Sequence, residues 1–191
     1  MGTKQRVLEL MGTNVYLVPL EDVRVHDAPG TILPATAADD DLGIAGSFGT
    51  FPQLIGGDCK ATNVQRYGRF LISLHIPQNR PLAKTGFKIR IYVDMETTVA
   101  DVSCTVDLEA YARVDGTPTD VCLTAAQDMN SLTASMKEFE IDLSQSAGIF
   151  LVNGYTWLDC RVTIACHDDA TQTPVSPAIY AIGACRVDAI D

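Results

Sequence analysis

The feature that most constrains the fold of this chain is an alternation of apolar and polar residues with a period of two. The clearest example runs from Trp157 to His167, where Leu158, Cys160, Val162, Ile164 and Cys166 are apolar. Successive side chains of a strand point to opposite faces of its sheet, so this pattern predicts a strand with one buried and one solvated face. The same alternation occurs in Tyr67–Ile76, Phe87–Met95, Cys104–Arg113 and Glu138–Leu143.

Turns and weaker strands extend this pattern to an all-β fold. A final strand is predicted over Ile179–Ile190, a short one near Val121–Thr124 and another within residues 46–62. Asp115-Gly116 and Asn153-Gly154 predict turns, and no segment has a helical period of useful length. Such a strand set is typical of a β-sandwich, either a jelly roll or an immunoglobulin-like domain. The immunoglobulin pattern of a tryptophan between two bridging cysteines is absent, which favours the jelly roll.

The N-terminal region differs from the remainder of the chain. Val15–Leu20 and Val23–Val25 can pair as short strands, after which Pro29 and Pro34 interrupt regular structure. We therefore expect an extended N-terminal arm over residues 1–37 and a sandwich domain over 38–191. An arm lying on a neighbouring molecule and a flexible terminus both remain open at this point.

Charge and hydropathy exclude two classes of partner. The 191 residues carry a net charge of −10, of which residues 1–95 contribute +1 and residues 96–191 contribute −11. This acidic half argues against binding to nucleic acid. The acidic residues of this half form either a solvated face or a face that meets a basic partner. No apolar run approaches the roughly 18 residues that cross a bilayer, so no membrane partner is expected.

The six cysteines show no metal-binding or redox spacing, since neither a CxxC pair nor a Cys/His finger pattern occurs. Cys104, Cys160 and Cys166 are in phase with the apolar faces of their strands, and cysteine packs well in cores. We expect free buried thiols in a chain made in a reducing cytoplasm. A disulfide framework is the alternative.

Clusters of charged residues have simple structural explanations. His167-Asp168-Asp169 and Asp39-Asp40-Asp41 contain metal-binding donors, but solvated turns are the expected outcome. Glu138, Glu140 and Asp142 share a strand face, where charge protects a sheet edge. The basic residues that we considered as a possible binding group are Arg66, Arg69, Lys84, Lys88 and Arg90. No catalytic residue, metal ligand or cofactor site emerges, so we do not expect an enzyme.

Four segments carry a family resemblance: ADDDLGIAGSFG (38–49), DMETTVADVSCTVDLEAY (94–111), TAAQDMNSLTASMKEF (124–139) and DCRVTIACHDDATQT (159–173). In these the chain resembles small structural proteins of tailed bacteriophages, often encoded beside the major capsid protein. The resemblance implies a virion protein synthesised in the host bacterial cytoplasm. Capsid decoration (cement) proteins of this kind are commonly β-sandwiches that sit as trimers on the outer shell, so the implied partners are the major capsid protein and further copies of this chain.

Candidate partner contacts are Phe48, Phe51, Leu54, Ile55 and Trp157. The alternative is that these residues cap the sandwich core. The expected function is stabilisation of the capsid shell. The alternative function is a tail-fibre or receptor-binding head that recognises a host glycan, for which Trp157, Tyr92 and Tyr111 are aromatic residues on polar strand faces.

Overall fold

The computed structural model describes residues 15–46, 50–57, 64–76, 85–95, 102–129, 133–168 and 177–188. Within these ranges the chain forms antiparallel strands and short 3-10 turns. The strands are β1 (Val15–Val18), β2 (Gly43–Ala45), β3 (Gln53–Ile55), β4 (Val64–His75), β5 (Thr85–Met95), β6 (Val102–Ala112), β7 (Gln127–Asp128), β8 (Ser135–Asp142), β9 (Tyr155–Asp168) and β10 (Pro177–Asp188). The 3-10 turns are η1 (Leu20–Asp22) and η3 (Leu143–Gln145).

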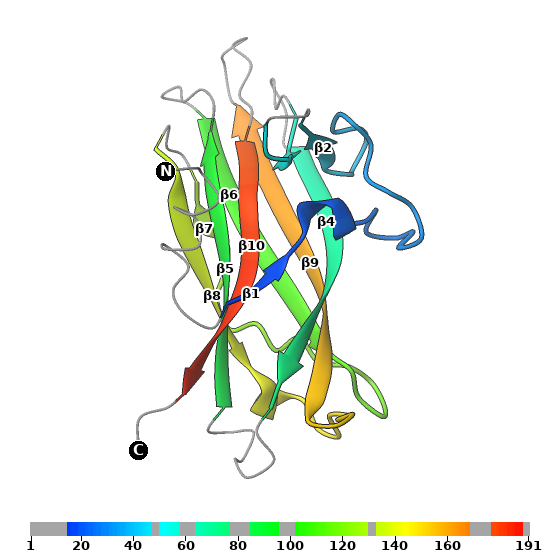
Figure 1. Cartoon of the computed structure of the whole chain (residues 1–191). Helices are drawn as coiled ribbons and strands as arrows, with labels where there is room; N and C mark the ends of the chain where they lie inside the picture. The colour runs from blue at the N-terminus through cyan, green and yellow to red at the C-terminus, as the bar shows by residue number, and fades with distance from the viewer. Residues whose placement is uncertain are drawn as a thin grey trace.

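The strands form two sheets with jelly-roll topology. One sheet has the order β2-β3-β10-β5-β8, with β1 also paired to β10, and the other has the order β4-β9-β6-β7 (Figure 1). The last eight strands form nested antiparallel pairs: β6 with β7, β5 with β8, β4 with β9 and β3 with β10. A long hairpin that wraps over itself into two sheets produces this order. The predicted β-sandwich of jelly-roll type is confirmed.

The period-two alternation correctly located the long strands. In β9 the predicted inward residues Leu158, Cys160, Val162 and Ile164 are at most 1% exposed. Two local predictions were wrong. Residues 15–18 pair with β10 and not with residues 23–25. The strand predicted at 121–124 is a single bridge at Cys122, and β7 follows a few residues later.

The core lies between the sheets and is built from the inward faces of the long strands. Its largest fully buried side chains include Phe70, Phe87 and Phe139, one from each of three different strands. Burying such a side chain contributes about 1.5–3 kcal/mol. Among the described residues, the buried polar side chains are Ser146 and Thr156. The interior is therefore a packed apolar layer.

The N-terminal strap (residues 15–25) closes one side of the sandwich, running from β10 in one sheet to β4 in the other (Figure 1). Val23 and Val25 are buried beside β4. The backbone N–H of Arg24 donates to the carbonyl of Arg69 at 2.8 Å, and the N–H of Arg69 donates back at 2.9 Å. The described part of the predicted arm thus lies on its own sandwich. The division between residues 37 and 38 stays a prediction.

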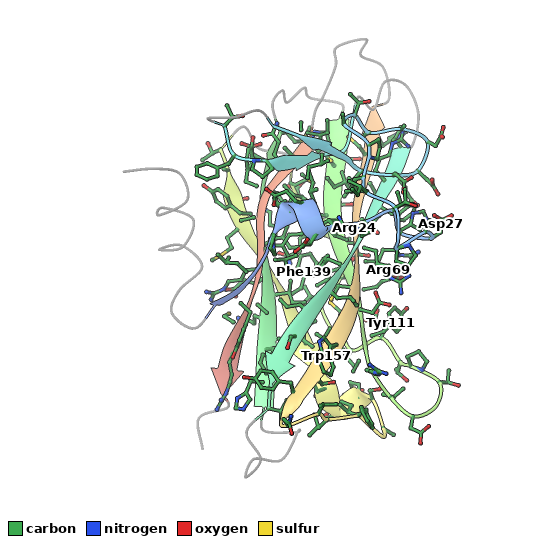
Figure 2. The ribbon with its side chains drawn as sticks, turned by 45° about the vertical axis from the view of Figure 1, so that its right-hand side comes forward. Arg24, Asp27, Arg69, Tyr111, Phe139 and Trp157 are labelled. Atoms are coloured by element: carbon green, nitrogen blue, oxygen red, sulfur yellow. The ribbon has the colours of Figure 1, made fainter. Side chains whose placement is uncertain are left out.

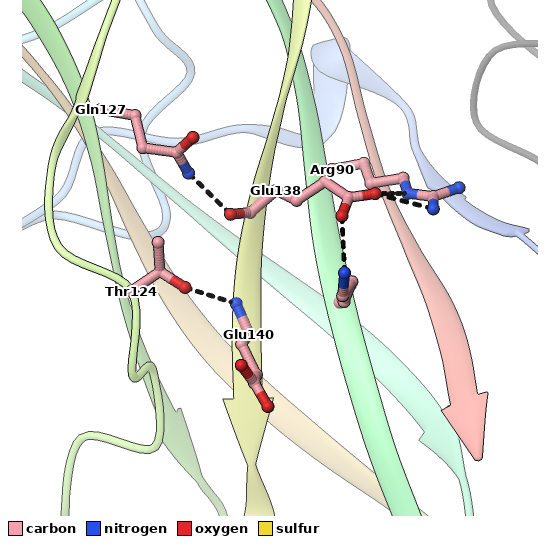
Figure 3. Close-up of polar contacts among 6 residues, drawn as sticks. Arg90, Thr124, Gln127, Glu138 and Glu140 are labelled. Atoms are coloured by element: carbon pink, nitrogen blue, oxygen red, sulfur yellow. Dashed lines mark hydrogen bonds and ion pairs between the residues drawn. The ribbon is translucent and has the colours of Figure 1, made fainter. Parts of the chain in front are cut away.

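The cover segment (residues 120–129) closes the opposite side, over the edge of β8. Leu123 N–H donates to the Glu140 carbonyl at 2.9 Å, and Glu140 N–H donates to Thr124 Oγ1 at 2.8 Å. Gln127 Nε2 donates to the Glu138 carbonyl at 2.6 Å (Figure 3). The edge of β8 is thus protected chiefly by pairing. This corrects the prediction that the charges of Glu138, Glu140 and Asp142 protect this sheet edge.

Candidate functional site

The predicted contact residues lie at opposite ends of the sandwich. Strand register defines an upper end, where Val64 pairs with Cys166, and a lower end, where His75 pairs with Tyr155. The β3 region, which includes Leu54 and Ile55, meets β10 near the upper end. Trp157 is two residues from the lower end of β9. The structure therefore does not bring these residues together into one surface.

Burial separates the members of the predicted contact set. Leu54 is 0% exposed and packs in the core, so the prediction that it contacts a partner was wrong for this residue. Phe51 is 55% exposed, and Ile55 and Trp157 are partly buried. Phe48 lies outside the described residues. For Phe51, Ile55 and Trp157 a partner contact stays a prediction.

Sequence reasoning missed an apolar surface at the lower end, the end patch, which consists of Phe150, Leu151, Val152 and Tyr155. These side chains are 51%, 43%, 40% and 42% exposed. They flank the predicted turn at Asn153-Gly154, whose residues have φ of 52° and 81°. Val152 and Tyr155 exchange backbone hydrogen bonds of 2.8 and 2.9 Å across that turn. The detectable signal was an apolar run directly before a turn, where polar residues are usual.

The end patch is anchored to the neighbouring strands. Phe150 N–H donates to the Arg113 carbonyl at 2.8 Å, and the Arg113 guanidinium lies 5.7 Å from the centre of the Phe150 ring. The rings of His75 and Tyr155 are 4.9 Å apart. These contacts fix the backbone and the rings around the turn, and the four apolar side chains stay at the surface.

A second feature is the outer-face pocket, which lies on the solvent side of the β4-β9-β6 sheet. It has a volume of about 510 Å³. Its lining includes Leu71, Tyr111, Arg113, Pro118, Trp157 and Asp159. Asp159 pairs with Leu71 on one side and with Tyr111 on the other. Figure 2 shows Trp157 and Tyr111 in the lower half of the molecule (Figure 2).

Ion pairs cover the same outer face above the pocket. Arg69 holds both oxygens of Asp159, with Nε to Oδ1 at 2.7 Å, and this hydrogen bond raises the pKa of Arg69. Arg161 lies 2.5 Å from Glu109 and stacks 5.0 Å from the ring centre of Tyr67. These arginines are therefore already engaged by groups of the same chain.

The predicted basic group is divided between the two sheets. Arg66 and Arg69 belong to β4, whereas Lys88 and Arg90 belong to β5 in the other sheet. Lys84 lies outside the described residues. Lys88 Nζ and Arg90 Nε donate to Glu138 at 2.7 and 2.8 Å, and the Lys88 hydrogen bond is the main cause of the lowered pKa of Glu138. The described members of this possible binding group therefore lie on two different sheets and do not form one cluster.

Two acidic clusters have structural partners. Asp142 caps η3 by accepting from the Ser144 hydroxyl at 2.6 Å, from Gln145 Nε2 at 2.8 Å and from the Ser144 N–H at 2.9 Å. These hydrogen bonds, that of the hydroxyl foremost, lower the pKa of Asp142. His26 lies 3.3 Å from Asp41 and 3.5 Å from Asp40, with its ring beside Tyr67. The atoms of His26, Asp40 and Asp41 that could ligate a metal ion all lie within 4.8 Å of one another. In the cluster predicted at 167–169, the two aspartate side chains lie outside the described part.

Four cysteines of the described part of the chain keep a protonated thiol. Cys104, Cys122, Cys160 and Cys185 form no disulfide. Burial raises the pKa of Cys104 to about 12 and that of Cys122 to about 11. Burial also raises the pKa of Cys160 well above its usual value. Cys166 is disulfide-bonded, which corrects the expectation that its thiol is free.

Comparisons with known proteins give little guidance. No family model and no curated protein matches the chain. A chain in the structure of infectious bursal disease virus Gt strain aligns with a TM-score of 0.33 and 15% identity, over 70% of this chain and 33% of that chain. This chain thus spans about a third of the solved chain. That TM-score is below the level at which two chains share a fold. Among the described residues, no helix has the length and hydropathy to span a membrane.

Proposed function

We propose that this chain is a structural protein of a tailed bacteriophage virion, a decoration protein that binds the outer face of the capsid shell as a trimer. The observation that carries the proposal is the nested strand pairing of a jelly roll, an architecture common in viral capsid domains. Jelly rolls also serve as lectins and enzymes, so the fold alone assigns no role. The four sequence segments that resemble phage structural proteins direct the choice among these roles.

The described side chains fit a non-catalytic protein. Arg69, Arg161 and Glu138 are engaged in ion pairs on the sheet faces. The thiols of Cys104 and Cys122 are neutral at physiological pH because burial raises their pKa values. Such groups stabilise a rigid scaffold, and rigidity suits a protein that reinforces a shell.

The end patch is the surface that we assign to the capsid contact. Burying apolar area contributes about 25 cal/mol per Å², so four half-exposed side chains give only a modest contact. Three patches on one trimer would bind with much higher avidity, because the second and third contacts form at high local concentration. The proposal therefore requires an oligomer whose patches face the same way.

Localisation on purified virions tests this proposal directly. Cryo-electron microscopy of particles with and without the protein should show density for it on the outside of the head. Light scattering after gel filtration should give the mass of a trimer, and particles without the protein should lose their genome at a lower temperature. Density at the tail, or a monomer that leaves particle stability unchanged, contradicts the proposal.

One observation favours the alternative of a receptor-binding head. Trp157 and Tyr111, from β9 and β6, line a single pocket together with charged groups. A receptor-binding head would sit at the tail and bind a host glycan, whereas a decoration protein covers the head. The same micrographs therefore separate the two functions.

A further inference from the structure

The outer-face pocket has the size of a ligand site. Its volume of about 510 Å³ lies within the roughly 300–1,000 Å³ typical of small-molecule sites. Such sites combine mostly apolar walls with a few polar groups that fix the orientation of the ligand. Here Trp157, Tyr111 and Leu71 supply apolar surface, and Asp159 and Arg113 supply the polar groups.

Strand register places the two aromatic side chains side by side. Tyr111 lies directly opposite Asp159 in the β6-β9 pair, and Trp157 is two residues before Asp159 on the same face of β9. Diagonal neighbours of this kind lie about 7–8 Å apart. One ring-sized ligand can therefore lie against both aromatic side chains.

The polar groups of the pocket are fixed and have unused hydrogen-bonding capacity. The two oxygens of Asp159 each accept one hydrogen bond from Arg69, and each has a further lone pair. Arg113 stacks on Phe150, and its guanidinium has no ion pair within the described part of the chain. The pocket thus presents an acceptor and a donor beside an aromatic surface.

The charged side chains that line the pocket, Arg113 and Asp159, have opposite signs. Because their charges cancel, the lining favours an uncharged ligand. A wholly apolar ligand would cover the Arg113 guanidinium and the remaining lone pairs of Asp159 without giving them hydrogen-bond partners, which is costly. A proline-rich segment also stacks on aromatic side chains, but proline has no N–H to donate to Asp159. A sugar hydroxyl both donates and accepts, so it satisfies both groups.

We propose that the outer-face pocket binds a neutral pyranose ring of a glycan. An apolar face of the ring packs on Trp157 and Tyr111, while its hydroxyl groups donate to Asp159 and accept from Arg113. This binding activity is independent of the capsid role, because the pocket lies on the outer sheet face and the end patch lies at the hairpin end of the molecule. The two surfaces meet where Arg113, which lines the pocket, stacks on Phe150 of the end patch. Substitutions away from that contact, such as Tyr111→Ala and Leu151→Asp, should therefore change one activity and leave the other unchanged.

The single tryptophan of the chain provides the readout, because Trp157 lines the pocket. The full chain is first applied to an array of neutral oligosaccharides and bacterial surface polysaccharides, and a bound oligosaccharide is then titrated in solution. We expect a saturable change in tryptophan emission. Tyr111→Ala should weaken binding by about 5- to 150-fold, since stacking on one aromatic ring is worth ~1–3 kcal/mol in the analogous case of nucleobases. Tyr111→Phe should retain most of the affinity.

Tyr92→Ala is the matched control, because Tyr92 is a partly buried tyrosine on the other sheet, in edge contact with Tyr180. Its affinity for the oligosaccharide should equal that of the unmodified protein. Thermal unfolding of each variant verifies its fold. The proposal is overturned by an array without any bound glycan, by equal losses in Tyr111→Ala and Tyr92→Ala, or by an emission change with decaproline and none with sugars.

Discussion

Glycines set the tightest constraints at the scale of single residues. Gly43 lies where β2 passes the segment before it, and a Cβ there would collide with the backbone N of Ala37 and approach the carbonyl carbon of Thr36 to 2.5 Å. Backbone atoms cannot move away as the end of a flexible side chain can. Gly30, by contrast, has open space around the position of a Cβ.

Gly43→Ala should therefore lower the free energy of unfolding by about 1–3 kcal/mol, the usual cost of overpacking. Urea denaturation followed by tryptophan fluorescence measures it. The control, Gly30→Ala, should leave stability unchanged or raise it by up to ~1 kcal/mol, because alanine restricts the unfolded chain. Equal stability of the two variants contradicts the close approach at Gly43.

The buried thiols predict a loss of stability in alkali. In the unfolded chain Cys104 loses its proton near pH 9, whereas in the folded protein its pKa is about 12. Between these values the unfolded state binds fewer protons, so the free energy of unfolding falls as the pH rises, by up to ~1.4 kcal/mol per pH unit for this group. Below pH 9 the contribution is fully present.

Urea denaturation of the unmodified protein and of Cys104→Ala across this pH window measures the effect. The stability of Cys104→Ala should fall less steeply with pH, because the other titrating groups are common to both proteins. Parallel slopes would show that Cys104 does not cause the alkaline loss.

At the scale of elements, the N-terminal strap is an integral part of the sandwich. Leu20, in η1, is 5% exposed, whereas Leu17, in β1, is 41% exposed. Leu20→Ala should lower the free energy of unfolding by about 2–5 kcal/mol, the range for a buried leucine. Leu17→Ala should change it by less than ~0.5 kcal/mol, as is usual at the surface. Calorimetry tests the pair, and a stable Leu20→Ala variant would indicate that the strap contributes little.

The elements also show what the sequence predicts and what it leaves open. Period-two alternation located β4, β5, β6, β8 and β9, because each has one face in the core and one in solvent. β1 was expected as a short strand but with the wrong partner, and β7 is too short to show a period and was not located. Their partners, β10 and β6, follow from tertiary pairing that no local pattern records.

The same limitation explains the candidate site. The alternation predicts that Trp157 and Tyr111 are aromatic residues on the polar faces of their strands. Their proximity depends on the register that places Tyr111 opposite Asp159. The aromatic side chains of the pocket can therefore be identified from the sequence, whereas their assembly into one site depends on the pairing of the strands. The hydrophobic run at 150–152 was visible in the sequence, but its exposure depends on the hairpin that ends at Tyr155.

At the scale of the whole molecule, the end patch makes a prediction about assembly. Leu151→Asp places a charge in the patch without touching the core, since Leu151 is 43% exposed. Its binding to shells lacking the protein should fall at least tenfold, because the three contacts of a trimer are weakened together. Co-sedimentation with the shells measures binding.

Ile32→Asp is the matched control for this experiment, because Ile32 is 67% exposed and lies outside the end patch. It should bind shells as the unmodified protein does. Normal binding by Leu151→Asp, or an equal loss in both variants, contradicts the assignment of the patch to the capsid contact.

The pairing of β10 has a further consequence, which concerns synthesis. The last strand pairs with β1, β3 and β5, and Val15 meets Cys185 across 170 positions of chain. During translation the strap and β3 therefore emerge from the ribosome long before β10, with which they pair, has been synthesised. Contacts of such long range form slowly. The nascent chain must keep its first strands from pairing wrongly until β10 emerges, so its yield in cells should depend on chaperones and on temperature more strongly than the stability of the finished sandwich suggests.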